Sequence, residues 1–236
     1  GNNWLGYLIH HAPQTMLYIE PTEAVAKRVS KQRIEPMIRD TEVLRALVAG
    51  DEPDRPVRSR LARKVTILEK YWPGGRLTLA SAKSSASLRN LSVQNLFADE
   101  LDEWDIEIGA RGEKKSQGDP YVLAQKRLDA FAGRSKTLAT STPTSAGSSR
   151  ICDEYDQTNQ CVIEVPCPFC AHYQQITFFG HIKWPKNPDR PEDAYMVCED
   201  CGAVIDEAHK EIMLARHRWV PTAKGKPGWI GFLIPA

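Results

Sequence analysis

Apolar and polar positions follow two different patterns along the first 150 residues of the chain. Short apolar runs bounded by turn residues predict strands at 16–20, 65–68, 76–80, 95–98 and 136–140. Apolar residues at helical spacing predict helices at 3–11, 23–39 and 120–132. Strands that alternate with helices are typical of a mostly parallel sheet with helices on both faces. The pattern therefore predicts an α/β fold here.

The predicted helices have definite inward and outward faces. The helix at 23–39, capped by Thr22, would bury Ala24, Val25, Ala26, Val29 and Ile34. Its outer face would carry Lys27, Arg28, Lys31 and Arg33, either as a solvated surface or as a patch that faces a polyanion. The helix at 120–132 would bury Val122, Leu123 and Leu128. The strands at 65–68 and 76–80 would flank the turn Pro73-Gly74-Gly75.

From about residue 161 the pattern changes to short strands, turns and paired cysteines. We expect a hairpin of 173–178 with 182–184, then a loop at 185–193 and a helix at 207–216. The boundary lies near 157–166, which divides the chain into a first domain at 1–160 and a small metal module at 161–236. Charged stretches with proline or glycine predict further surface loops at 50–60 and 109–119.

Charge and composition narrow the classes of function. The 31 basic and 30 acidic residues nearly cancel, so any contact with nucleic acid must come from local patches. No apolar run approaches the roughly 18–20 residues that cross a bilayer. The first residues also lack the basic region and cleavage site of a signal peptide. We therefore expect an intracellular protein with no membrane partner.

The cysteines carry the most specific motif. Cys167-Pro168-Phe169-Cys170 is followed after 27 residues by Cys198-Glu199-Asp200-Cys201-Gly202. Two such turns place four thiolates around one ion, so Cys167, Cys170, Cys198 and Cys201 predict a structural Zn²⁺ site. Gly202 can take the positive φ that the second turn needs. Disulfides or a redox pair are less consistent with a matched double motif. Cys152 and Cys161 are expected to be ordinary buried or half-buried thiols.

Polar residues also follow the predicted strands. The run at 95–98 ends in Asp99 and Glu100, and the run at 136–140 ends in Ser141-Thr142-Pro143-Thr144. At the carboxyl edge of a nucleotide-hydrolysing sheet, the Asp would orient Mg²⁺ and the Glu would polarise the attacking water. The hydroxyls would sense the γ-phosphate. The alternatives are a strand that merely ends in polar residues and a capped turn. A third strand end, at 18–22, is similar to a helicase segment next to nucleic acid.

Together these residues resemble the large subunit of tailed-phage terminases of the lambda type. The resemblance runs through IEPMIRD at 34–40, LFADELD at 96–102, GDP at 118–120, KR at 126–127, STPT at 141–144, SRI at 149–151, VPCPFC at 165–170, CEDCG at 198–202 and PGWIGF at 227–232. It implies a P-loop-type, helicase-like ATPase sheet followed by a zinc ribbon. It also implies that Asp99 orients magnesium, that Glu100 is the catalytic glutamate of a Walker B motif, and that Ser141, Thr142 and Thr144 form a coupling motif.

The resemblance further implies a working assembly. Such motors use ATP and Mg²⁺ to push double-stranded DNA into a procapsid in the host cytoplasm, and they carry a separate nuclease. The small subunit and the portal are the expected partners, and the motor is a homo-oligomer. Arg89 lies where related motors place an arginine that reaches a neighbouring subunit's nucleotide. Its alternative is an ordinary surface residue.

Two departures from the family pattern qualify these expectations. Gln94 and Asn95 interrupt the strand before Asp99, which predicts a less deeply buried strand. No G-x-x-x-x-G-K-[ST] phosphate loop (Walker A) occurs in the sequence. The chain is therefore expected to be a truncated piece that starts after that loop and stops before the nuclease, and to hydrolyse ATP poorly alone. A non-catalytic zinc-ribbon binding module and another helicase-like nucleic-acid ATPase remain the alternative functions.

Overall fold

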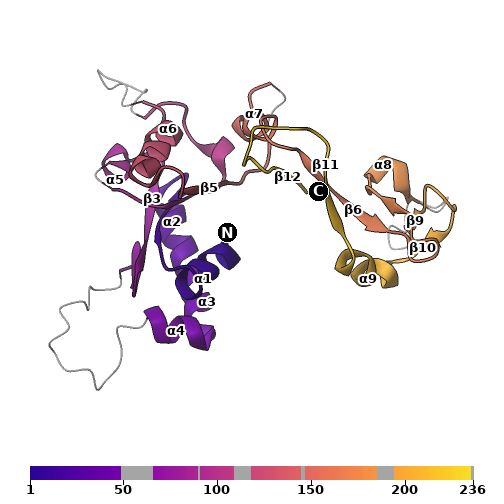
Figure 1. Ribbon diagram of the computed structural model, residues 1–236, viewed down its shortest axis with the longest axis horizontal. Helices are drawn as coiled ribbons and strands as arrows, with labels where there is room; N and C mark the ends of the chain where they lie inside the picture. The colour runs from indigo at the N-terminus through magenta and orange to yellow at the C-terminus, as the bar shows by residue number, and fades with distance from the viewer. Residues whose placement is uncertain (49–65, 90, 109–117, 145–146, 185–193, 235–236) are drawn as a thin grey trace. The chain divides into compact units, whose positions relative to one another are not determined.

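The computed structural model describes residues 1–48, 66–89, 91–108, 118–144, 147–184 and 194–234. The chain divides into two compact units (Figure 1). Unit 1 is Gly1–Ile151 and unit 2 is Cys152–Ala236. The expected loops at 50–60 and 185–193, and nearly all of the one at 109–119, lie outside the described residues.

Unit 1 is built on a five-stranded sheet in the order β2-β3-β1-β4-β5. Strands β3, β1, β4 and β5 are parallel, and only β2 is antiparallel, to β3. The expected mixed α/β fold with a mostly parallel sheet is therefore confirmed. The strand bounds are β1 Thr15–Glu20, β2 Glu69–Trp72, β3 Gly75–Ser81, β4 Asn95–Ala98 and β5 Lys136–Ala139.

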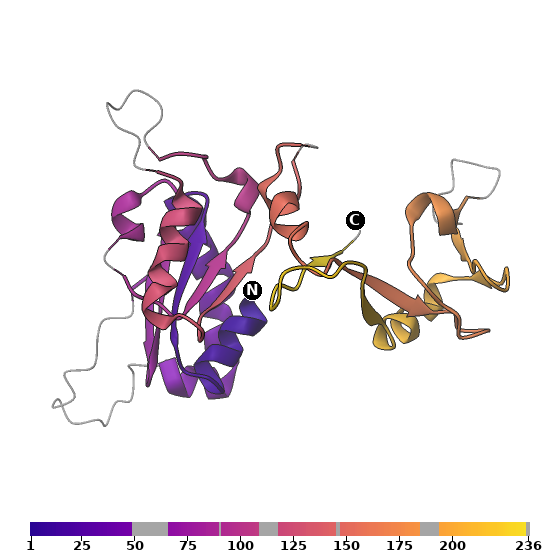
Figure 2. The ribbon, with the colours of Figure 1, turned by 45° about the horizontal axis from the view of Figure 1, so that its top comes forward.

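Two groups of helices cover the two faces of this sheet (Figures 1 and 2). Residues alternate along β1, so Met16 and Tyr18 enter one apolar core while Leu17 and Ile19 enter the other. The first core is covered by α1 Asn2–His10, α2 Glu23–Val29, a π-helix Ser30–Ile34, α3 Glu35–Asp40 and α4 Glu42–Val48. The second is covered by α5 Ser85–Leu88, α6 Pro120–Gln125 and a 3₁₀-helix Lys126–Phe131.

Several sequence expectations for unit 1 were wrong in detail. The strand expected at 65–68 lies at β2, because a two-residue turn at Pro73 and Gly74 sets Trp72 opposite Gly75. Asn95 does not leave β4 exposed: all four residues of this central strand are buried, and the Asn95 amide donates to Gln14. Residues 85–88 form the short helix α5, where the sequence predicted no element.

Two predicted inward residues point outward. Val122 is exposed, because Asp119 and Pro120 start α6 so that Tyr121 and Ala124 face the core. Ala24 is exposed in the first turn of α2, whose buried residues are Ala26 and Val29. Thr22 does cap α2 as expected, accepting a hydrogen bond from the Val25 amide.

Unit 2 is centred on β6 Cys161–Pro166, which pairs with β11 Arg218–Pro221, β12 Phe232–Leu233 and β7 Tyr173–Gln174. A second small sheet has the order β10-β9-β8. The expected hairpin is therefore wrong, since β7 pairs with β6 while β8 pairs with β9. The remaining bounds are β8 Ile182–Lys183, β9 Tyr195–Val197, β10 Val204–Ile205, α7 Arg150–Tyr155, α8 Phe178–His181, a 3₁₀-helix Glu207–His209 and α9 Lys210–Ala215.

None of the helices in the described part of the chain combines the length and apolarity that a bilayer crossing requires.

Candidate functional site

Asp99 lies directly after β4, at the edge where the parallel strands end. Its backbone N–H donates to Ile19 of β1 at 3.0 Å, which fixes the start of the turn. The Tyr18 hydroxyl donates to Asp99 Oδ2 at 2.9 Å, and the Thr140 hydroxyl donates to Asp99 Oδ1 at 2.6 Å. Burial, and then the nearby Asp99 charge, raise the pKa of Tyr18, so the phenol remains a donor. The carboxylate is therefore held from both neighbouring strands.

Glu100 is exposed and adopts a left-handed conformation with φ of 51°. This region is unfavourable for a residue with a Cβ, by about 1–3 kcal/mol, and such strain gathers at functional sites. Hydrogen bonds on either side of Glu100 stabilise this backbone conformation. The Trp104 indole donates to the Asp99 carbonyl, and the Leu101 N–H donates to the Thr140 carbonyl. Glu100 thus follows Asp99 directly at this edge of the sheet, with its side chain exposed.

The predicted hydroxyl residues gather on Asp102 rather than on Asp99. Ser141 Oγ accepts from the Asp102 amide at 3.1 Å, and the Thr144 amide and hydroxyl both donate to Asp102 Oδ2. Burial alone would raise the pKa of Asp102, but hydrogen bonds led by the Ile151 amide outweigh it and the pKa is lowered. Thr142 contributes only its carbonyl, to Ser141. Sequence reasoning missed Asp102, whose only signal was its place in a run of acids.

A polar cavity of about 390 Å³ opens beside Asp99. The first turn of α1 forms one wall, where Gly1 packs so closely on Phe97 that a Cβ would collide with the ring. The lining is completed by residues from β1, the π-helix and β4 and from the turns after β4 and β5. The lining residues are Gly1, Asn2, Asn3, Tyr18, Arg33, Phe97, Asp99 and Thr140.

Arg33 and Arg89 differ in their position relative to the cavity beside Asp99. Arg33, expected on the outer face of its helix as a solvated residue or as part of a patch that faces a polyanion, lines the cavity from the π-helix. Arg89, the expected catalytic arginine, is exposed at the end of α5 and is not among the cavity's lining residues.

Glu20 is a second carboxyl at this edge and was missed by sequence reasoning. It ends β1, is only 1% exposed, and its Oε1 has no hydrogen-bond partner among the described residues. Burial and then the Asp99 charge raise the pKa of Glu20 to about 7, although Tyr18 and Arg33 oppose the shift. Glu20 therefore carries a proton through most of the acidic range.

The raised pKa of Glu20 predicts a pH-dependent stability. As pH rises from about 4.5 to about 7, the unfolded chain releases this proton while the folded chain retains it, so the wild-type protein loses stability. Glu20→Gln removes the titration, and its advantage should reach about 2–3 kcal/mol by pH 8. We expect a gain in melting temperature of roughly 5–10 °C at pH 8 and little at pH 5. Exposed Glu42→Gln is the control, and a pH-independent difference would contradict the assignment.

The four cysteines of the double motif come together in unit 2. Their sulfurs all lie within 4.8 Å of one another. Cys167 and Cys201 are 3.9 Å apart and Cys170 and Cys198 are 3.8 Å apart. Zn–S bonds of about 2.3 Å in a regular tetrahedron place sulfurs about 3.8 Å apart. The thiolate set and its spacing therefore fit one zinc ion.

The two cysteine turns share one backbone frame. In each turn, the carbonyl of the first cysteine, Cys167 or Cys198, accepts from the amide four residues later, of Ala171 or Gly202. The N–H of the same cysteine donates to the carbonyl five residues later, of His172 or Ala203. Ala171 and Gly202 have φ of 61° and 71°, so the positive φ expected at Gly202 is confirmed. Glu199 joins the turns, because it accepts from His172 at 3.0 Å and from His181 at 3.3 Å.

Comparison with known families decides the assignment. The family model described as phage terminase large subunit gpA, ATPase domain, matches residues 1–219. The chain belongs to the phage terminase large subunit family. Comparisons with curated proteins and with solved structures gave no match. Membership supports a role in the phage DNA-packaging motor and implies ATP and Mg²⁺ as ligands. Large subunits of this family generally work with DNA, a small subunit and a portal.

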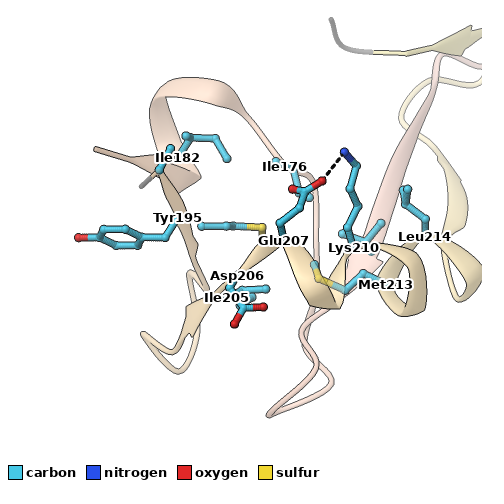
Figure 3. A pocket seen from close by; sticks show the side chains of 12 residues that line it. Ile176, Ile182, Tyr195, Ile205, Asp206, Glu207, Lys210, Met213 and Leu214 are labelled. Carbon is cyan, nitrogen blue, oxygen red and sulfur yellow. Dashed lines mark hydrogen bonds and ion pairs between the residues drawn. The ribbon is translucent and has the colours of Figure 1, made fainter. Parts of the chain in front are cut away.

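Another cavity of the terminase chain, about 330 Å³, lies in unit 2 (Figure 3). Apolar side chains such as Ile176, Ile182 and Met213 line it. Its charged groups are already paired: Lys210 binds Glu207 at 2.8 Å, and Asp206 caps the 3₁₀-helix. A catalytic pocket needs free convergent polar groups, which this cavity lacks among the described residues.

The two remaining cysteines of the terminase chain lie outside the metal cluster. Cys161 is buried and its thiol lies 3.3 Å from the Asn159 side-chain oxygen, as expected for an ordinary core thiol. Cys152 is exposed, contrary to the expectation of burial, because α7 buries none of its residues.

Proposed function

We propose that the cavity beside Asp99 binds the phosphate end of ATP. Hydrolysis of this ATP would drive the translocation of viral DNA into the procapsid. The observation that carries this proposal is Asp99, held by Tyr18 and Thr140 and facing a polar cavity at the carboxyl edge of a parallel sheet. Ligands of open α/β sheets bind at this edge. The first-turn amides of α1 are suited to an anion there.

The donor set fits magnesium. Asp99 Oδ2 accepts the Tyr18 hydroxyl and keeps a further lone pair, whereas Oδ1 accepts both the Thr140 hydroxyl and the Glu100 amide. Thr140 supplies a second hard oxygen. When bound, Mg²⁺ would neutralise charge on the phosphate oxygens. The protein's own residues would supply the rest: Asp99 would hold the metal, and Glu100, exposed directly after it, would take a proton from the attacking water.

We propose that ATP hydrolysis is coupled to DNA movement through the turn after β5. Thr140 touches Asp99, while Ser141 and Thr144 hold Asp102 two positions beyond Glu100. Loss of the γ-phosphate beside Asp99 would therefore be transmitted to the segment that starts at Ser141. Thr142, the third member of the expected motif, extends this turn.

The zinc module is proposed to be a structural zinc ribbon rather than a DNA reader. Unit 2 carries 8 basic and 12 acidic residues, a net charge of −4, whereas unit 1 carries 23 basic and 18 acidic residues, a net charge of +5. Four zinc-bound thiolates add further negative charge. Since phosphate contacts dominate DNA affinity, DNA is expected on unit 1. The charge of unit 2 therefore argues against the alternative of a zinc-ribbon nucleic-acid module.

Arg89 is proposed to act in trans, on a neighbouring subunit's nucleotide, because it is exposed at the end of α5. We expect Arg89→Ala and Glu100→Gln each to be inactive alone but to regain part of the ATP turnover in mixed oligomers, where one subunit supplies Glu100 and its neighbour supplies Arg89. If the ATP turnover of Arg89→Ala is within threefold of wild type, Arg89 is an ordinary surface residue with no catalytic role.

The test of the proposed function is Mg²⁺-dependent ATP turnover by the complete natural polypeptide, measured with and without double-stranded DNA. We expect turnover that DNA stimulates. A protein that binds DNA but neither binds nor hydrolyses ATP would overturn the proposal.

A further inference from the structure

Arg33 is the only arginine or lysine that lines the Asp99 cavity among the described residues. Its guanidinium makes no hydrogen bond or ion pair with another described side chain, although it stands close enough to Tyr18 and Glu20 to influence both electrostatically. A cation that faces a polar cavity without a fixed partner is free to bind an anionic ligand there. Guanidinium groups match phosphate oxygens with two parallel hydrogen bonds.

The backbone that carries Arg33 is unusual. Residues 30–34 form a π-helix, in which the Glu35 N–H donates to the Ser30 carbonyl, five residues back. Pro36 accounts for the wide turn, because it has no N–H for an ordinary helical bond and its ring crowds the carbonyl four residues earlier. Single π turns inside α-helices are frequent at functional sites.

The wide turn is clamped from the sheet. Lys70 of β2 is 1% exposed, and its ammonium donates to Ser30 Oγ at 3.1 Å and to Glu35 Oε1 at 2.9 Å. It also donates to the carbonyls of Thr66 and Ile67. Both ends of the π-helix are thus fixed by one buried cation. The backbone segment that carries Arg33 is therefore held in place by the sheet.

We propose that Arg33 is a catalytic residue that contacts the phosphates of ATP from within the same subunit. This inference rests on the proposed function, and it assigns to Arg33 the stabilisation of charge that develops on the transferring phosphoryl group. Arg89, exposed on α5, is the trans counterpart and does not replace it.

The test is ATP turnover and nucleotide binding by the complete natural polypeptide carrying Arg33→Ala. We expect kcat/KM for ATP to fall by about 10²-fold or more. Arg33→Lys keeps the charge but loses the two-pronged geometry, so it should retain a larger part of the activity. The matched control is Arg28→Ala, which removes another exposed arginine from α2, outside the cavity, and should leave turnover within twofold.

Mixed oligomers separate this inference from the assignment of Arg89. Arg33→Ala and Glu100→Gln damage the same active site, so mixing them should restore no turnover. Restored turnover, or Arg33→Ala activity within threefold of wild type, would overturn the cis assignment and leave the proposed function standing. Wild-type protein that does not hydrolyse ATP would instead overturn the proposed function itself.

Discussion

Cys198→Ser should unfold unit 2 while unit 1 keeps its structure. The Cys198 side chain is 2% exposed and packs in the core of unit 2 with Val165, Met196 and Met213. Structural zinc contributes on the order of 10–16 kcal/mol in small zinc domains, which matches or exceeds the whole stability of a typical domain. Hydrogen exchange should therefore lose protection over 152–236 and retain it over the sheet of unit 1. Elemental analysis should find about one zinc per wild-type chain and none in the variant.

The matched control for the zinc prediction is Cys161→Ser. It makes the same change at a buried thiol of unit 2 outside the four-cysteine cluster. This variant should keep its zinc and lose at most about 1–2 kcal/mol, from an added hydroxyl in the core. A strong chelator should reproduce the Cys198→Ser pattern in the wild-type protein. Unchanged protection after complete removal of zinc would contradict a structural role.

The four-cysteine cluster and the sheet were predictable because their signals are local. Two residues between cysteines fix where both sulfurs of one turn point, so the spacing alone predicted the four-cysteine cluster that the structure assembles. The run at 16–20 and the acids after β4 likewise marked strand ends. The strand at 69–72 was missed because the apolar run at 65–68 lies beside it, and its inward residues include Lys70, whose burial depends on partners 35 and 40 positions away.

The contacts within the candidate site could not be read from the sequence. Asp99 accepts its hydrogen bond from Thr140 rather than from Ser141 because of the register between β4 and β5. Ala98 lies opposite Ala139, so the next residues, Asp99 and Thr140, are side by side. Glu20 becomes a buried carboxyl only because β1 lies between β3 and β4. Arg33 reaches the cavity through a π turn that periodicity does not encode. Each depends on strand register or backbone irregularity, which a single sequence does not display.

Glu100→Gln should abolish ATP turnover and leave nucleotide binding nearly unchanged. Glutamine keeps the size of the side chain and its exposed place directly after Asp99, but its amide cannot accept a proton from water. Loss of a general base typically lowers the rate by about 10²–10⁴-fold. We expect the upper half of this range because Asp99, the carboxylate that lines the cavity, already accepts hydrogen bonds from two hydroxyls. Single-turnover hydrolysis and equilibrium binding of a fluorescent ATP analogue would measure the two effects separately.

Glu103→Gln is the matched control, since Glu103 is an exposed glutamate one turn further on whose amide donates to the Glu100 carbonyl. It changes the net charge of this edge by the same amount, so a purely electrostatic effect on phosphate binding would appear in both variants. A proton-accepting role would appear in Glu100→Gln alone, as a fall in kcat with the binding constant preserved. If Glu100→Gln turns over ATP within threefold of wild type, the proton acceptor is another group, and the left-handed strain at Glu100 serves the turn rather than the chemistry.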